Sequence, residues 1–325
     1  MGGMSSPQIT AVLGDITNVR VDVVVNAANG AMRGGGGVDG AIHRAGGRTV
    51  LAECIARFPN GLATGDAGWT KAGKLPARWV VHTVGPNHRA GETDRGLLES
   101  CYRRALEVAD ELGARSVAFP LISTGSYGWP RRDAIAVAVA TIASARTSVT
   151  EVQLVAFDVN AFEAIEGQLA RVTALRILEG VRVLHQRGYH AVRILPGMSA
   201  SGMHWRVSVT HCANLHDAAG HPSIRDWDRA INYTTGAGAA FAGGRVTAAT
   251  DPSTVADLAL RALPELATVW ADPGYVRWYE QLMEIVEGHG GLPISYADHF
   301  GGVDGWEIGW GSGVRHPHPP QPPVA

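Results

Sequence analysis

The chain has 325 residues, of which 46% are hydrophobic and 18% are charged, and its formal net charge at pH 7 is −2. This composition is typical of a folded globular protein, and the length predicts two domains. Proteins that bind nucleic-acid backbones usually carry a clustered basic excess, so the near-neutral charge argues against nucleic acid as a partner.

The three cysteines, Cys54, Cys101 and Cys212, lie far apart in the sequence. An odd number without regular spacing predicts reduced thiols rather than a disulfide framework, and therefore a cytoplasmic protein. There is no leader-like N-terminus and no apolar run of about 18 residues, so neither export nor membrane insertion is predicted. The first half has no tight Cys/His cluster in the sequence, so we expect no metal and no cofactor.

Short runs rich in Val and Ile alternate with segments of helical length up to about Arg171. The expected strands are Ile9 to Leu13, Val21 to Val25, Trp79 to Val84, Val117 to Ile122 and Val152 to Phe157. The expected helices are Val38 to Ala45, Thr49 to Phe58, Leu97 to Leu112 and Asp133 to Ala145. This alternation predicts an α/β domain over residues 1–171, in which a mostly parallel sheet has helices on both faces. Such sheets bind ligands at the carboxyl ends of their strands.

Residues 172–315 have the pattern of a separate α+β domain. The expected helices are Val172 to Gln186, Pro252 to Leu263 and Gly274 to Glu287, and the expected strands are Tyr189 to Leu195, Met203 to His211 and Ile231 to Thr235. A turn over Pro196 to Ser199 is expected between the first two strands. The Pro-rich residues 316–325 are expected to be disordered.

A glycine-rich loop follows the second expected strand and carries the strongest chemical signal. Four consecutive glycines, Gly34 to Gly37, precede a helix, with Asn29 before them and Asp39 after them. Glycines leave backbone N–H groups accessible, and the helix N-terminus is positively polarised, so the loop can hold a phosphate. Asn29 can hold hydroxyl groups, and Asp39 can orient a water molecule or a ribose hydroxyl. His43 lies one helical turn after Asp39 on the same face.

A second glycine loop, Ser123 to Pro130, connects another expected strand to another expected helix. It has the same strand–loop–helix arrangement, and two such loops at one sheet edge suit a diphosphate. No Gly-Lys-Ser/Thr motif occurs, and the first loop lacks the Gly-x-Gly-x-x-Gly spacing. NTP hydrolysis and hydride transfer are therefore disfavoured.

Six ordered blocks in the first half of the chain resemble the macrodomain family, and specifically its MacroD-like branch of ADP-ribose hydrolases. These blocks are GDIT (Gly14 to Thr17), VVNAAN (Val24 to Asn29), GGGGVDGAIH (Gly34 to His43), TGDA (Thr64 to Ala67), LPARWVVHTVGP (Leu75 to Pro86) and ISTGSYGWP (Ile122 to Pro130). The resemblance implies a three-layer α/β/α fold with a mixed, mostly parallel sheet that binds ADP-ribose, or an ADP-ribosylated protein, across the strand ends.

The resemblance also implies roles for individual residues. Those that would contact the ligand are Asp15 and Ile16 at the adenine, Phe157 against the adenine ring, Gly36, Gly37 and Val38 at the distal ribose and diphosphate, and Ser123, Thr124, Gly125, Ser126 and Tyr127 over the phosphates. Asn29 and Asp39 match the active-site Asn and Asp of the family. His43 matches its supporting histidine.

Several of these side chains have a plain structural alternative. Asp15 could cap a turn, and Asn26, a candidate ligand-binding residue, could tie the strand end to neighbouring backbone. Phe157 could belong to the core, and His43 could be a structural histidine rather than a proton carrier. Tyr127 is expected to contact the ligand without being a catalyst.

Two function classes follow from these residues. The first is a hydrolase that removes mono-ADP-ribose from acidic side chains or deacetylates O-acetyl-ADP-ribose, with Asp39 activating water and Asn29 fixing the ribose. The second is a module that binds ADP-ribose without turning it over and uses the second domain as effector or scaffold. A binding module needs the glycine loops but not the carboxylate of Asp39, so the sequence favours the hydrolase.

The second half contains features with two readings. His211, Cys212, His216 and His221 could bind zinc, although their spacing favours polar surface residues. The glycine-rich segment Thr234 to Gly244 could bind a nucleotide, but a mobile loop is favoured because no clear helix start follows it. Trp227, Trp278, Trp306 and Trp310 are expected in a core rather than stacked on bases.

Overall fold

The computed structural model describes residues 4–187, 192–199, 202–210, 234–242 and 246–262. The chain divides into two compact units, Met1–Val172 and Thr173–Ala325. The division falls inside one long helix, α5 (Val159–Gln186). The first unit contains every residue that the sequence analysis assigned to the ligand site.

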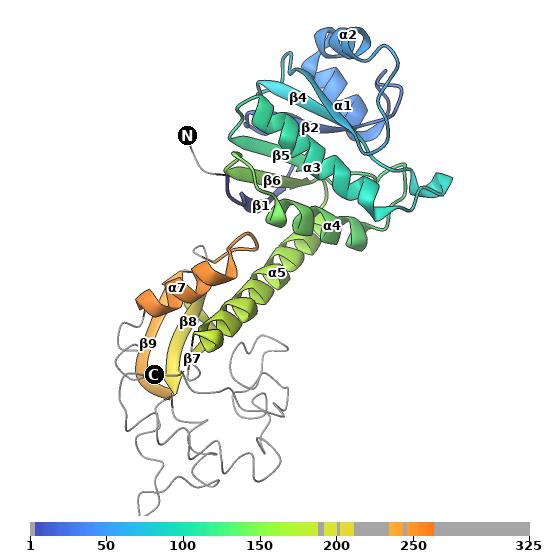
Figure 1. Ribbon diagram of the computed structural model, residues 1–325. Helices are drawn as coiled ribbons and strands as arrows, with labels where there is room; N and C mark the ends of the chain where they lie inside the picture. The colour runs from blue at the N-terminus through green and yellow to red at the C-terminus, as the bar shows by residue number, and fades with distance from the viewer. Residues whose placement is uncertain (1–3, 188–191, 200–201, 211–233, 243–245, 263–325) are drawn as a thin grey trace, which may run out of the picture. The chain divides into compact units, whose positions relative to one another are not determined.

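The first unit is built around a six-stranded sheet with the order β1-β6-β5-β2-β4-β3 (Figure 1). The strands are β1 (Gln8–Leu13), β2 (Val23–Ala28), β3 (Ala67–Lys71), β4 (Trp79–Val84), β5 (Ser116–Pro120) and β6 (Glu151–Ala156). All neighbouring pairs are parallel except β3 and β4, which are antiparallel. The expected mostly parallel mixed sheet is therefore confirmed.

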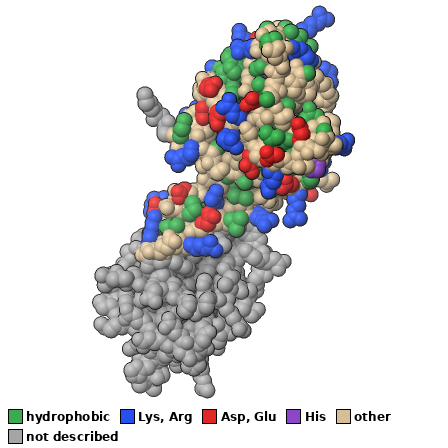
Figure 2. Space-filling view, turned by 45° about the vertical axis from the view of Figure 1, so that its right-hand side comes forward, with side chains coloured by type: hydrophobic (Ala, Val, Ile, Leu, Met, Phe, Trp, Pro, Cys, Tyr) green, Lys and Arg blue, Asp and Glu red, His purple; other side chains and the backbone are tan. Residues whose placement is uncertain are grey.

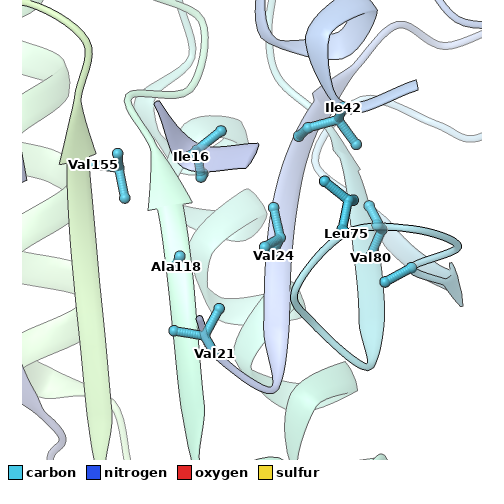
Figure 3. Close-up of a cluster of buried hydrophobic side chains, with 9 residues drawn as sticks. Ile16, Val21, Val24, Ile42, Leu75, Val80, Ala118 and Val155 are labelled. Carbon is cyan, nitrogen blue, oxygen red and sulfur yellow. The ribbon is translucent and has the colours of Figure 1, made fainter. Parts of the chain in front are cut away.

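One face of the sheet packs against helix α1 (Gly37–Gly46), next to which lies α2 (Arg48–Arg57). Alternate residues of the strands, such as Val24, Val80 and Ala118, meet Ile42 of α1 in a single buried cluster (Figure 3). Since side chains alternate between the two faces of a strand, Asn26 points to the same face as Val24, and His82 to the same face as Val80.

The opposite face is covered by α3 (Arg95–Glu111) and α4 (Arg131–Ser144), which pack against each other. Phe119 of β5 is fully buried there against Tyr102 of α3, with ring centroids 5.3 Å apart. The hydroxyl of Tyr102 accepts a hydrogen bond from the backbone N–H of Ile122, which ties α3 to the loop after β5. The first unit thus has the expected three layers, α/β/α.

The sequence predicted most elements to within a few residues, but α5 begins at Val159 and not at the expected Val172, and the sequence missed β3. Its residues Ala-Gly-Trp-Thr-Lys include no Val or Ile, so they lack the signal of a buried strand. They form an edge strand because β4 offers its free side for pairing. Strand β2 begins two residues later than expected and continues to Ala28, which carries Asn26 into the sheet itself.

The second unit contains a three-stranded antiparallel sheet, β7 (Val192–Ser199), β8 (Gly202–Thr210) and β9 (Thr234–Ala242), and helix α7 (Pro252–Ala262). Two expectations were wrong here. Residues Pro196 to Ser199 continue β7 instead of forming a turn, and proline is tolerated because β7 is an edge strand. Of the strand expected over Ile231 to Thr235, only Thr234 and Thr235 are described, and they begin β9. Gly236 to Ala242, expected in a loop, continue β9, because pairing with β8 satisfies a glycine- and alanine-rich backbone.

Several expectations lie outside the described residues. They concern His211, Cys212, His216 and His221, the four tryptophans Trp227, Trp278, Trp306 and Trp310, the helix from Gly274 to Glu287, and residues 316–325. The extent of a separate domain over 172–315 also stays a prediction. Among the described helices, none combines the length and the apolar character that crossing a bilayer requires.

Candidate active site

A pocket of about 210 Å³ lies where β2 and β5 end and α1 begins. It is lined by Ala27, Ala28, Asn29, Gly35, Gly36, Gly37, Val38, Asp39, Gly85, Leu121, Ser123, Gly125, Ser126 and Tyr127. Both glycine loops predicted from the sequence therefore border one pocket. Lining residues to which the sequence gave no role of their own are Ala27, Ala28, Gly85 and Leu121.

The first loop presents the N-terminus of α1 to this pocket. Gly36 is the N-cap residue and makes no side-chain cap, and Gly37 has a φ of +56°, which favours glycine. The first backbone N–H groups of an α-helix have no partner within the helix, and together they carry a partial positive charge. This end of the pocket is consequently suited to an anion.

The second glycine loop packs closely against Gly85, the residue that follows β4. A Cβ atom on Gly85, just after β4, would lie 2.2 Å from Oγ of Ser123, so only glycine fits there. Ser123 itself has a φ of +65°, and its buried Oγ has no hydrogen-bond partner among the described residues. Thr124 turns away, because its hydroxyl donates to the carbonyl of Leu121. Ser123 therefore offers a hydroxyl to whatever binds in the pocket.

Asp39 is almost completely buried in the first turn of α1, with 5% of its surface exposed. Its Oδ1 accepts a hydrogen bond of 2.7 Å from Nδ2 of Asn26. Nε2 of His43 lies 3.2 Å from the same oxygen, as the one-turn spacing predicts. Oδ2 lies on the side of Gly35, where an added Cβ would come within 2.9 Å of it. One carboxylate oxygen is thus engaged by the protein, and the other adjoins a pocket-lining residue.

Asn29 is half-buried and shapes the first loop. Its Nδ2 donates to the carbonyl of Gly34 at 2.8 Å, and its Oδ1 accepts from the N–H of Ala31 at 3.1 Å. The same Nδ2 would lie 3.2 Å from a Cβ on Gly35. Oδ2 of Asp39 and Nδ2 of Asn29 therefore lie together beside Gly35, where a side chain would project, as a pair facing the same ligand would.

Tyr127 covers the pocket from the second loop. Partial burial raises the pKa of its hydroxyl, and the negative charges of Glu92 and Asp39 raise it further. The phenol consequently stays protonated at neutral pH and can act as a hydrogen-bond donor.

Three predicted adenine contacts lie away from the pocket lining, at the ends of β1 and β6. Asp15 caps a short 3-10 helix (Ile16–Asn18): its Oδ1 accepts from the N–H and the hydroxyl of Thr17. The side chain of Ile16 is buried in the core cluster. Phe157 is 84% exposed, so the alternative that it belongs to the core is wrong.

Asn26 does not line the pocket and is fully buried. Its amide joins Asp39 to His82 of β4, whose Nδ1 lies 3.0 Å from Nδ2 of Asn26. This differs from the expected tie to neighbouring backbone. His82 was missed in the sequence, although a histidine inside the apolar strand Trp-Val-Val-His-Thr-Val was a signal.

The structure also corrects the expectation that the first half has no Cys/His cluster. His43, Cys54 and His82, from α1, α2 and β4, bring one possible ligand atom each to within 4.8 Å of one another. Positions 43, 54 and 82 are too far apart in the sequence to indicate such a group. Both cysteines of the first unit are free, as expected.

A second, more open pocket of about 620 Å³ is lined by residues around Lys71, Gly73, Arg78 and Trp79. None of the predicted site residues lies in it. On the face of the molecule shown in Figure 2, basic and acidic side chains are interspersed, in keeping with the near-neutral charge. The smaller pocket is therefore the one that combines the predicted chemistry.

Comparisons with known proteins point to one family. The family model described as "Macro domain" matches residues 25–138, and no family model matches the C-terminal half. A macro domain-containing protein of Streptomyces coelicolor is 57% identical over 165 residues, which is 50% of this chain and 98% of that protein. A Pantoea vagans protein named O-acetyl-ADP-ribose deacetylase 1 is 46% identical over 48% of this chain and 95% of its own length.

A solved structure gives the same answer for the fold. A mutant of the Oceanobacillus iheyensis macrodomain with ADPR has a TM-score of 0.50 and 37% identity, and the match covers 53% of this chain and 96% of that chain. The three layers, the two glycine loops at one sheet edge and these similarities together show that the chain belongs to the macro domain family.

Proposed function

We propose that this chain binds ADP-ribose in the 210 Å³ pocket and hydrolyses ADP-ribosyl esters. The substrates are mono-ADP-ribose on acidic side chains of proteins and O-acetyl-ADP-ribose. The observation that carries the proposal is the meeting of two glycine loops with Asp39 and Asn29 around one pocket.

The diphosphate fits between the two loops. The N-terminus of α1 provides N–H groups and partial positive charge from one side, and Ser123 provides a hydroxyl from the other. The relative from Oceanobacillus iheyensis, whose structure contains ADPR, supports this choice of ligand.

The adenine is assigned to the ends of β1 and β6. Phe157 is an exposed aromatic side chain that a purine ring can cover, and base–aromatic stacking contributes roughly 1 to 3 kcal/mol. Asp15 uses Oδ1 for its cap, which leaves Oδ2 for the adenine amine.

The chemistry is assigned to Asp39, whose Oδ2 adjoins Gly35 in the pocket lining. The carboxylate accepts a proton from a water molecule that attacks the ester, and Asn29 holds the ribose beside it. A positioned general base contributes about two to four orders of magnitude in rate. None of these steps requires a metal, so we propose that hydrolysis is independent of divalent cations. The relative named O-acetyl-ADP-ribose deacetylase supports a hydrolase over a module that only binds.

The test compares the wild type with Asp39→Ala and Asn29→Ala on a protein mono-ADP-ribosylated at Asp or Glu, and on O-acetyl-ADP-ribose. We expect release by the wild type, unaffected by EDTA, and a loss of at least about 100-fold in the Asp39→Ala variant. Calorimetry should show that this variant still binds ADP-ribose. Binding by all three proteins without any release would instead identify a binding module.

A second comparison tests the ligand itself. Phe157→Ala should weaken ADP-ribose binding by about 5- to 100-fold, because stacking is lost. Ile55→Ala, which removes another exposed apolar side chain from helix α2, is the matched control and should bind normally. Equal affinity of both variants would remove the adenine assignment.

A further inference from the structure

A chain of hydrogen bonds lies behind the pocket, on the side of Asp39 that faces the sheet. Nδ2 of Asn26 donates to Oδ1 of Asp39 at 2.7 Å, and the same nitrogen lies 3.0 Å from Nδ1 of His82. Nε2 of His82 lies 2.9 Å from Oγ1 of Thr70. Asn26, His82 and Thr70 are all fully buried, so none of them reaches a ligand directly.

The direction of these bonds follows from the chemistry of the groups. An ionised carboxylate only accepts, so the amide nitrogen of Asn26, and not its oxygen, must face Asp39. The second hydrogen of that nitrogen then points to Nδ1 of His82, which has to be the unprotonated ring nitrogen. The ring proton of His82 is accordingly on Nε2, towards the hydroxyl of Thr70.

The charge state of His82 agrees with this arrangement. Burial and, to a lesser extent, the nearby His43 lower the pKa of His82 to about 3, although Asp39 acts in the opposite sense. The ring is consequently neutral at physiological pH and keeps a lone pair on Nδ1 for the amide.

The sheet fixes the positions of the residues that make these hydrogen bonds. Asn26 and His82 are direct register partners on the neighbouring parallel strands β2 and β4, and Thr70 lies on β3, the next strand. Asp39, in contrast, stands on the first turn of a helix that follows a run of glycines. A side chain in that position gains its fixed orientation from the strands beneath it.

We propose that His82, acting through Asn26, is a positioning residue that fixes the carboxylate of Asp39 for attack on the ester. The inference rests on the hydrolysis proposed above and deepens it. A carboxylate displaced by a fraction of an ångström still accepts hydrogen bonds from the ligand, but it no longer aligns the attacking water molecule. Substitution of His82 should therefore lower the rate of hydrolysis while leaving the affinity for ADP-ribose nearly unchanged.

Metal binding by His43, Cys54 and His82 is the competing use of the same ring. Both nitrogens of His82 already have partners in Asn26 and Thr70, so a metal would have to break one of these bonds. Burial also raises the pKa of Cys54 to about 11, as do the charges of Asp39 and Glu53, so its thiol holds its proton. These observations favour the hydrogen-bonded chain, and the experiment distinguishes the two.

The experiment uses the full chain with His82→Asn, His82→Gln and, as a control, Cys54→Ala. An Asn side chain carries its amide near the position of Nδ1 and can still accept from Asn26, whereas Gln carries its amide near Nε2. Cys54 is equally buried, and its sulfur lies 3.5 Å from Nε2 of His82, but it has no bond to Asn26.

We expect kcat to fall about 10- to 100-fold in His82→Gln, with KM and the affinity for ADP-ribose within about threefold of the wild type. The His82→Asn variant should recover most of kcat. Cys54→Ala should keep its kcat although its melting temperature falls. Nitrogen-15 NMR of the wild-type histidines should show the His82 proton on Nε2.

Three results would overturn the proposal. Equal kcat in His82→Gln and the wild type would show that the ring does not position Asp39. Loss of kcat in Cys54→Ala, or inhibition of the wild type by EDTA with recovery on adding zinc, would show that packing or a metal controls the rate. A proton on Nδ1 of His82 would mean that this nitrogen cannot accept the hydrogen bond from Asn26. If the wild type released no ADP-ribose, the proposed function would fail, while the NMR result would still decide the hydrogen bonds.

Discussion

Two side chains that the proposed hydrolysis uses lie next to Gly35. A Cβ atom there would lie 2.9 Å from Oδ2 of Asp39 and 3.2 Å from Nδ2 of Asn29. Asp39 cannot move away freely, because Asn26 holds its other oxygen. The requirement for glycine at this position therefore comes from side-chain contacts and not from backbone strain.

We predict that Gly35→Ala lowers the rate of ADP-ribose release by about 10- to 100-fold, because it displaces the carboxylate. The melting temperature should change little, since the position is exposed. Gly167→Ala in α5, where an added Cβ meets nothing within 4 Å, is the control and should have wild-type activity. An active Gly35→Ala enzyme would mean that Asp39 is not held as tightly as the hydrogen bonds indicate.

His82 also predicts how stability depends on pH. Its pKa is about 3 in the folded protein and about 6.5 when unfolded. Above pH 6.5 the ring is neutral in both the folded and the unfolded state, so it does not make the free energy of unfolding depend on pH. Between pH 6.5 and 3 only the unfolded state takes up the proton, so the free energy of unfolding falls as the pH falls.

The full loss from this group is on the order of 4 to 5 kcal/mol, most of it between pH 6.5 and 3. Urea unfolding at a series of pH values measures it, with His82→Asn or His82→Gln for comparison. Both variants should show a flatter profile than the wild type in this interval. Parallel profiles would mean that the ring is protonated in the folded state.

Among the elements, the start of the central strand β2 depends on one carboxylate. Oδ2 of Asp22 accepts from the backbone N–H groups of Arg115 and Ser116, at 2.8 and 3.2 Å, where β5 begins. Burial raises the pKa of Asp22, but these hydrogen bonds, together with one from the hydroxyl of Ser116 and the charge of Arg78, outweigh burial and lower the pKa overall. The carboxylate thus joins β2 and β5 at the end of the sheet opposite to the pocket.

We predict that Asp22→Ala lowers the free energy of unfolding at pH 7 by about 1 to 3 kcal/mol, because two N–H groups lose a charged acceptor. Because the pKa of Asp22 is lowered in the folded protein, the difference in free energy of unfolding between Asp22→Ala and the wild type should shrink as the pH falls below about 4. Glu107→Ala, which removes an exposed ion pair with Arg104, should change stability by less than about 1 kcal/mol. Chemical unfolding of the three proteins provides the comparison.

For the whole molecule, the structure predicts that the ligand site needs only the first unit. All residues of the pocket and of its supporting hydrogen bonds lie within Met1–Val172. The Streptomyces coelicolor relative is matched over 98% of its length by 50% of this chain. A macro domain of this size therefore occurs without the second unit.

We predict that a chain truncated after Val172 binds ADP-ribose and cleaves O-acetyl-ADP-ribose within about threefold of the full chain, because no site residue is removed. A second truncation, after Gln186, keeps α5 whole and controls for damage to this helix. Calorimetry and product release measure both. Loss of binding in both truncations would mean that the second unit contributes to the site.

The sequence alone determined the alternation of strands and helices, the two glycine loops and their neighbours Asn29 and Asp39. These features follow from local patterns, because a strand, a glycine run and a helix start are encoded by adjacent residues. It could not indicate β3, which forms an edge strand only because β4 is there to pair with it. The same holds for β9, whose residues had the composition of a loop.

Only the tertiary structure decided which side chains meet. Thr70, His82, Asn26 and Asp39 are brought into one chain of hydrogen bonds by strand register across β3, β4 and β2 and by the packing of α1 on the sheet. The spacing of these residues along the sequence does not predict their contact, because the register between strands depends on the whole sheet. The glycine loops could therefore be predicted from sequence, whereas the support of the carboxylate could not.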